Sequence, residues 1–393
     1  MTKDHRPRGV KTIATHAGRA PFKNHGIVNP PVYHASTVLF ETVEQLRKTP
    51  GPRDVRYGRY GTPTTFALED AVAALEGAAS SVLVSSGKAA ITTALVAFAK
   101  SGDHILVADG VYAPTRAFCN GLLKGMGVET SYFDPMIGAG VADLFRPNTT
   151  VMVAESPSSI TFEVPDSRAL TAAARAAGVT SMVDSTWGAL INFPAFELGY
   201  DVSMHAGTKY VVGHADSMLG LIGCRDDAIG KTVRDAANML GQCVGPDDCY
   251  LALRGLRTMP TRLKAHEAAA LRVAEWLSSR PEVARVLHPG LPDNPYHLQF
   301  KTDFKGACGL FAIELKPIAD AKLVAFLESL KLFGMGYSWG GFESLIVPQD
   351  PRPLRTAKPW TDEGPLVRLH IGLEDVDDLI ADLQQGFAAM AAA

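Results

Sequence analysis

Long apolar runs are missing from this sequence. No stretch of about 18 consecutive apolar residues occurs anywhere in the chain, so we expect no transmembrane helix. The start, Met1 to Lys11, is polar and charged and lacks the apolar segment of a secretory signal. Both absences count against an exported or membrane-embedded protein and point to the cytoplasm.

An excess of one charge sign is also missing. The chain has 38 basic and 41 acidic residues and a formal net charge of −3. Nucleic acids and anionic membranes usually recruit proteins with a basic excess, so we expect neither as a partner. Hydrophobic residues make up 47% of the chain, which is ample for a large core and more than one domain. Together with the small net charge, this is typical of a metabolic protein.

Cysteine is scarce. The five cysteines are scattered and odd in number, which excludes a disulfide framework. No CxxC pair or histidine-rich partner accompanies them, so we expect no metal site. The thiols are expected to be reduced core or surface residues.

Helical and strand patterns alternate from Thr62 onward. Apolar strands separated by helices predict a mostly parallel sheet between helices. The turn-rich residues 1–60 are expected to form an arm, residues 61–256 a large domain, and residues 257–393 a smaller α+β domain. Pro260 is expected to break or kink a long helical region at about 247–279. The predicted strands are Val82–Val84, His104–Ala108, Val151–Ala154, Ser181–Val183, Val202–Met204, Gly309–Leu315 and Leu366–Ile371, and the predicted helices include Ser167–Ala177 and Ala319–Leu330.

Candidate chemistry lies just after predicted strands, because ligands of parallel sheets bind at the carboxyl ends of strands. Gly87 and Lys88 follow one strand, in a turn that either cradles a phosphate at a helix N-terminus or is an ordinary connection. Asp184 follows another strand, where its carboxylate either keeps a pyridine nitrogen protonated or caps a helix.

Two cationic residues complete the set of candidates. Lys209 follows the strand Val202–Met204 and stands 25 residues after Asp184. A lysine in a partly dry pocket near positive charge has a lowered pKa and forms Schiff bases, whereas most lysines are simply exposed. Arg368 lies inside an otherwise apolar strand, where its guanidinium either binds a carboxylate or forms a structural ion pair.

Together these segments resemble the Cys/Met-metabolism family of enzymes, which use pyridoxal 5'-phosphate (PLP). The resemblance implies an α/β protein with the PLP-dependent transferase fold type I, similar to aspartate aminotransferase, and a smaller α+β C-terminal domain. It runs from Thr15-His16-Ala17-Gly18 to the last helix, and its anchors are Val183-Asp184-Ser185-Thr186-Trp187-Gly188, Gly207-Thr208-Lys209-Tyr210 and Gly213-His214-Ala215-Asp216.

The resemblance also implies a role for each matching residue. Tyr57 and Arg59 would reach the phosphate of a neighbouring subunit, which implies at least a homodimer, and homotetramers are typical of the family. Catalytic roles would fall to Lys209, which would bind PLP covalently, and to Tyr112 and Asp184. The cofactor would be bound by Tyr57, Arg59, Gly87, Lys88, Tyr112, Asp184, Thr208 and Lys209, and the substrate by Ser159, Ser338, Trp339 and Arg368.

Two stretches resemble the cystathionine β-lyase branch of the family more than its γ-acting branch. The stretch Glu155–Thr161 lacks the asparagine–proline pair that most γ-members have near Ser159-Ile160. The stretch Ser338–Leu345 carries Trp339 where γ-members have leucine. The implied reaction is a β-elimination that converts the sulfur amino acid L-cystathionine and water to homocysteine, pyruvate and ammonia in methionine biosynthesis.

The chain departs from the family pattern at two places. Ala206 stands three residues before Lys209, where many members have a hydroxyl, and Ala237-Asn238-Met239 lacks the tyrosine of some β-lyases. Two alternatives therefore stay open. One is a cystathionine or methionine γ-lyase, or a lyase of cysteine conjugates or cysteine itself. The other is a non-catalytic regulatory protein that has kept the fold.

Overall fold

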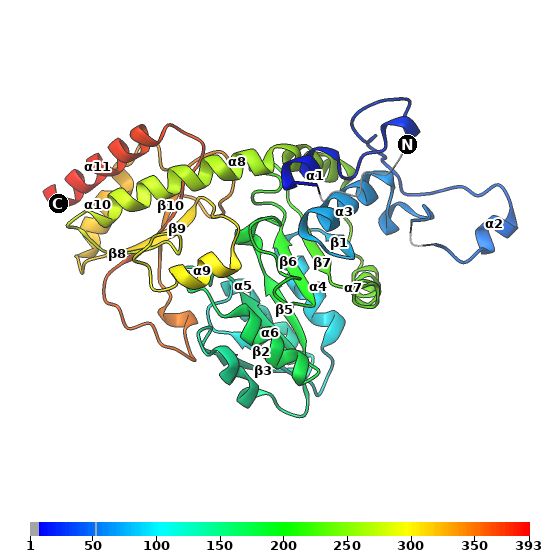
Figure 1. The fold of residues 1–393 in the computed structure, drawn as a ribbon, viewed down its shortest axis with the longest axis horizontal. Coiled ribbons are helices and arrows are strands. Elements are labelled where there is room, and N and C mark those ends of the chain that lie inside the picture. The colour runs from blue at the N-terminus through cyan, green and yellow to red at the C-terminus, as the bar shows by residue number, and fades with distance from the viewer. Residues whose placement is uncertain (1–7, 52) are drawn as a thin grey trace.

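The structure is a computed structural model that describes residues 8–51 and 53–393. Residues 1–7 and Pro52, which the predicted arm includes, lie outside the described residues. Figure 1 shows a large domain built on one sheet, a smaller C-terminal domain built on a second sheet, and an arm near the N-terminus.

Seven strands form the large sheet, in the spatial order β1-β7-β6-β5-β4-β2-β3. The neighbours β6-β5, β5-β4, β4-β2 and β2-β3 pair in parallel, and β7 is antiparallel to both β1 and β6. The prediction of a mostly parallel sheet is confirmed. The strands are β1 (Ser80–Val84), β2 (His104–Ala108), β3 (Glu129–Phe133), β4 (Thr149–Glu155), β5 (Thr180–Asp184), β6 (Val202–Ala206) and β7 (Gly220–Cys224).

Helices cover the large sheet, and local capping explains where two of them begin. The side chain of Ser86 accepts a hydrogen bond from the backbone N–H of Ala89 at the start of α4, and Asp166 caps α6 in the same way. Such caps fix the strand-to-helix turns that carry the candidate residues. The helices of this domain are α3 (Pro63–Glu76), α4 (Gly87–Phe98), α5 (Ala113–Phe118), α6 (Ser167–Ala176) and α7 (Asp227–Met239).

The C-terminal domain has its own antiparallel sheet, in the order β10-β11-β9-β8. A separate cluster of buried apolar side chains lies between this sheet and its helices, which agrees with the predicted α+β character. Its elements are β8 (Val283–Leu287), α9 (His297–Asp303), β9 (Leu310–Leu315), α10 (Asp320–Ser329), β10 (Leu345–Gln349), β11 (Leu366–His370) and α11 (Val376–Ala392).

One long helix, α8 (Pro246–Ser278), joins the two domains (Figure 1). It packs on α1 (Val10–His16) and α3 at one end and on β8 and α11 at the other. Of the predicted break or kink at Pro260, the break is wrong, because the helix continues through this buried proline, and the kink stays a prediction. Tertiary packing along the helix outweighs the missing hydrogen-bond donor. The expected domain boundary near residue 256 falls inside α8, and the domain limits stay a prediction.

The arm extends away from the body of the molecule around α2 (Val43–Arg47) (Figure 1). It exposes apolar side chains, among them Phe22 and Leu39, whose exposed fractions are 98% and 90%. Within residues 8–51 and 53–393, no helix combines the length and the apolarity that a membrane span needs. All five cysteines belong to the described residues and are free.

Candidate active site

A cavity of about 590 Å³ lies at the carboxyl ends of β4, β5 and β6. Loops of the C-terminal domain close its other side. The structure therefore brings together residues that are far apart in the sequence, as ligand binding at the strand ends requires. The predicted site residues that line the cavity are Gly87, Lys88, Tyr112, Ser159, Asp184, Thr208, Lys209, Ser338, Trp339 and Arg368.

Lys209 lies in the turn that follows β6. Its Nζ donates a hydrogen bond to Ser338 Oγ at 2.6 Å and lies 5.2 Å from the ring centroid of Trp339. Burial, and then the positive charge of Arg368, lowers the pKa of the Lys209 amine to about 8. A much larger fraction of this amine is therefore neutral near pH 7 than for an exposed lysine, as a nucleophile or a base requires.

Arg368 reaches the cavity from β11, and its Nη2 donates a hydrogen bond to the backbone oxygen of Ser338 at 3.2 Å. Ser338 has a φ of +86°, a backbone conformation that is costly for a residue with a side chain. Such strain persists only where the surroundings hold the backbone in place. Ser338 thus links the amine of Lys209 to the guanidinium of Arg368.

Asp184 is the last residue of β5. Its Oδ1 accepts hydrogen bonds from the backbone N–H of Thr186 at 3.0 Å and from the Thr186 hydroxyl at 2.6 Å. These donors hold the carboxyl group in one orientation at the strand end. Burial raises the pKa of Asp184, and the Thr186 donors act in the opposite direction. A cationic partner in the cavity would therefore stabilise the carboxylate.

The N-terminus of α4 forms the wall of the cavity at Gly87 and Lys88. A Cβ atom at Gly87 would lie 2.5 Å from the Cβ of Ala206, so the helix approaches β6 as closely as a glycine permits. The free N–H groups of the first helical turn suit an anion. The hydroxyl of Thr208 is engaged with the backbone of Leu219, to whose oxygen it donates at 3.3 Å and from whose N–H it accepts at 3.1 Å.

Tyr112 precedes α5 and is 45% exposed at the cavity wall. Its backbone N–H donates a hydrogen bond to Glu155 Oε2 at 2.6 Å. Glu155 also lines the cavity, although it is not among the predicted site residues. One signal in the sequence could have identified Glu155. Its carboxyl group directly follows the apolar strand Val151–Ala154, just as Asp184 follows the next predicted strand.

Tyr57 and Arg59 are not among the residues that line this cavity. Arg59 instead donates a hydrogen bond from Nη1 to the backbone oxygen of Asn238 at 3.0 Å, and its guanidinium lies 4.5 Å from the ring centroid of Tyr60. The role of Tyr57 and Arg59 in a neighbouring subunit stays a prediction.

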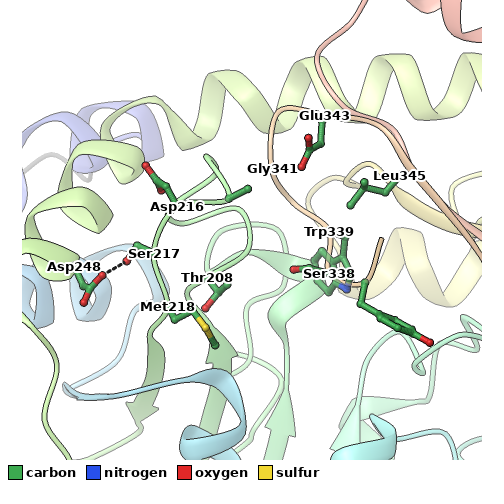
Figure 2. A pocket seen from close by; sticks show the side chains of 12 residues that line it. Thr208, Asp216, Ser217, Met218, Asp248, Ser338, Trp339, Gly341, Glu343 and Leu345 are labelled. Atoms are coloured by element: carbon green, nitrogen blue, oxygen red, sulfur yellow. Dashed lines mark hydrogen bonds between the residues drawn. The ribbon is translucent and has the colours of Figure 1, made fainter. Parts of the chain in front are cut away.

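A second cavity of about 520 Å³ adjoins the first. Figure 2 shows Ser338 and Trp339 on one side of it and Thr208 and Met218 on another, and these residues line both cavities. Ser217 donates a hydrogen bond to Asp248 at 2.8 Å at its far end. The site therefore continues beyond Lys209 toward a more acidic region.

The residues present fit PLP. The first cavity holds a lysine amine with a lowered pKa, a carboxyl group at a strand end and a helix N-terminus with a close glycine turn. These are the groups that a pyridine aldehyde with a phosphate needs. Among residues 8–51 and 53–393, no group of three or more His, Cys, Asp or Glu side chains is arranged to hold a metal ion.

Comparison with known proteins agrees with this class of site. The profile of the family described as Cys/Met metabolism PLP-dependent enzyme matches residues 11–388. The chain belongs to this family, and PLP is its cofactor.

Individual relatives match almost the full chain. A Rhizobium johnstonii protein, provisionally named a cystathionine beta-lyase, is 48% identical over 98% of this chain and 97% of its own length. Cystathionine beta-lyase MetC of Escherichia coli is 43% identical over 96% and 98%. The crystal structure of a cystathionine gamma synthase from Xanthomonas oryzae pv. oryzae, in complex with aminoacrylate and cysteine, matches with a TM-score of 0.91 and 31% identity over 98% of this chain and all of that one.

Proposed function

We propose that the chain is a carbon–sulfur lyase that converts L-cystathionine and water to homocysteine, pyruvate and ammonia, a step in methionine biosynthesis. The two relatives reported above, at 48% and 43% identity, carry the name cystathionine beta-lyase and support this substrate. The structural observation that supports the proposal is that Ser338 contacts both the Lys209 amine and the Arg368 guanidinium. A base would then act beside a group that binds the substrate carboxylate.

PLP, when bound, supplies an electron sink that allows a proton to leave Cα and the Cβ–S bond to break. Lys209 would hold the cofactor and its neutral amine would take the Cα proton. Asp184 would pair with the ring nitrogen, and the first turn of α4 at Gly87 and Lys88, with Thr208, would bind the phosphate. Tyr112 would lie against the ring.

The remaining residues act on the substrate. Arg368 would bind the α-carboxylate in a bidentate manner, with Ser338 and Ser159 beside it. The indole of Trp339 would narrow the space for the leaving group. The sulfur leaves as a thiolate, whose conjugate acid has a pKa of about 8.5, and takes back the proton that Lys209 removed. The three-carbon remainder reacts with water to give pyruvate and ammonia.

We infer further that the chain works as a homodimer at least, and as a tetramer built from such dimers, in the cytoplasm. The exposed apolar side chains of the arm, such as Phe22 and Leu39, support an interface with a second copy. Arg59 does not line the cavity of its own chain, which supports a role at the cavity of a neighbouring one.

Product analysis tests the proposal. The holoenzyme is incubated with L-cystathionine, cystine, S-alkylcysteines and methionine, and the keto acids are identified. Pyruvate as the keto acid from cystathionine is the expected result, and 2-oxobutyrate would identify a γ-lyase instead. Lys209→Ala serves as the inactive control. A holoenzyme that gives no keto acid from any of these substrates would favour a non-catalytic role.

A further inference from the structure

Two carboxylic acids stand side by side in the site. Glu155 is the last residue of β4 and Asp184 the last residue of β5, and the two are register partners in this parallel pair. Neighbouring strands lie about 4.8 Å apart, and both side chains line the same cavity. Two carboxylates that end neighbouring strands and share a cavity partly shielded from water are not both ionised without a large cost, so one of them holds a proton.

The hydrogen bonds favour Asp184 as the ionised member of the pair. Asp184 accepts two hydrogen bonds from Thr186, and these donors favour its ionised form. The cofactor ring nitrogen would add a cationic partner.

The groups around Glu155 stabilise a negative charge less well than those around Asp184. Its partners are the backbone N–H of Tyr112 and the hydroxyl of Ser159, both of them neutral. Within the described part of the chain, no lysine or arginine forms an ion pair with it, although Lys88, Lys209 and Arg368 line the same cavity. Burial, and then the charge of Asp184, raises the pKa of Glu155 well above its usual range. The cofactor phosphate and the substrate carboxylate would bring further negative charge.

We propose that Glu155 is a positioning residue that stays protonated in the working enzyme. One oxygen of its neutral carboxyl group accepts the Tyr112 amide and so fixes the start of α5, which sets where the Tyr112 ring lies over the cavity. Because Glu155 is neutral, Asp184 keeps the negative charge that the ring nitrogen requires. This goes beyond the reaction proposed above, although it rests on Tyr112 lying against the ring.

Infrared spectroscopy of the holoenzyme tests the protonation directly. The difference spectrum between wild type and Glu155→Gln should contain the carbonyl-stretch band of a protonated carboxylic acid. The matched control is Glu129→Gln, since Glu129 is an exposed partner of Arg146 whose pKa is lowered by that arginine. Its difference spectrum should show only carboxylate bands. A wild-type minus Glu155→Gln spectrum with carboxylate bands alone overturns the proposal.

Two substitutions test the positioning role. Glutamine has the shape of the neutral acid, so Glu155→Gln should keep kcat/KM within about threefold of wild type, and its cofactor absorbance should titrate as in wild type. Glu155→Ala leaves the Tyr112 amide without a partner and should lower kcat about tenfold or more. A Glu155→Gln variant as impaired as Glu155→Ala would mean that the ionised form is needed. The infrared measurement requires no turnover. A wrong assignment of the substrate can therefore be told apart from a wrong protonation state of Glu155.

Discussion

Gly87 and Ala206 lie against each other at the wall of the cavity, and position 87 has no room for a side chain. A Cβ atom at Gly87 would lie 2.5 Å from the Cβ of Ala206 and 2.8 Å from its Cα. Gly87 opens α4, and Ala206 ends β6 three residues before Lys209. The contact therefore sets the distance between the helix terminus that would face the phosphate and the lysine that would bind the aldehyde.

We expect Gly87→Ala to weaken both folding and cofactor binding. The added methyl group must push α4 away from β6, and such overpacking costs about 1–3 kcal/mol of unfolding free energy. Thermal unfolding of the apo protein and PLP titration measure the two effects. Gly121→Ala is the matched control, because nothing lies within 4 Å of a Cβ at that position. Equal losses in both variants, or none in Gly87→Ala, contradict the steric account.

The pH dependence of Lys209 gives a second prediction. Its pKa is about 8 instead of the ordinary 10.5, so in the apo protein its reaction with an amine reagent should reach half its limiting rate near pH 8. Removing the cation in Arg368→Gln favours the protonated amine, and the midpoint should move upward. Peptide mapping by mass spectrometry follows each lysine separately, and exposed lysines such as Lys231 serve as internal controls. A wild-type midpoint near 10.5 contradicts the lowered pKa.

The sequence predicted four of the five strands that pair in parallel, β2, β4, β5 and β6, and it missed strands β3, β7, β8 and β10. His104–Ala108 was predicted with its final bounds, since a fully buried strand is an uninterrupted apolar run. Strand β7 was missed because it contains Gly220, and glycine is rare inside strands. The fold requires a glycine at this position, since a Cβ atom there would lie 2.0 Å from the backbone oxygen of Ser86. Strand β10 was missed because of Pro348, which is tolerated there since β10 is an edge strand.

The site was largely predictable because the family motifs carry its residues. What the sequence did not reveal are contacts between distant segments. The link from Lys209 through Ser338 to Arg368 depends on a strained loop conformation that no local propensity favours. The carboxyl pair of Glu155 and Asp184 depends on strand register, which a single sequence does not specify.

Replacing Arg368 should affect substrate binding more than cofactor binding. Loss of a charge-assisted bond to the substrate carboxylate removes about 1.5–3 kcal/mol, so Arg368→Ala should raise KM for cystathionine about 10- to 100-fold. Steady-state kinetics with saturating PLP measure this. Arg352→Ala, which removes an exposed partner of Asp350, should leave KM unchanged. An Arg368→Ala enzyme with wild-type KM would assign the carboxylate to another residue.

Mixed oligomers test whether Arg59 acts across a subunit boundary. Lys209→Ala and Arg59→Ala should each abolish or severely lower activity on their own. If Arg59 serves the neighbouring cavity, a hybrid dimer has one cavity with both residues intact. Random assembly of the two variants makes half of the dimers hybrids, each with one working site of two, so co-expression should restore about a quarter of wild-type activity.

If Arg59 instead served the cavity of its own chain, every cavity in the hybrid would lack one of the two residues, and activity would stay at the level of the single variants. Arg59→Ala also removes the bond from Arg59 to Asn238 in its own chain, so the assembly of this variant must be checked separately. Size-exclusion chromatography of the Arg59→Ala protein separates loss of assembly from loss of the phosphate contact. Restored activity requires both a dimer and a shared site, so one measurement decides the two claims together.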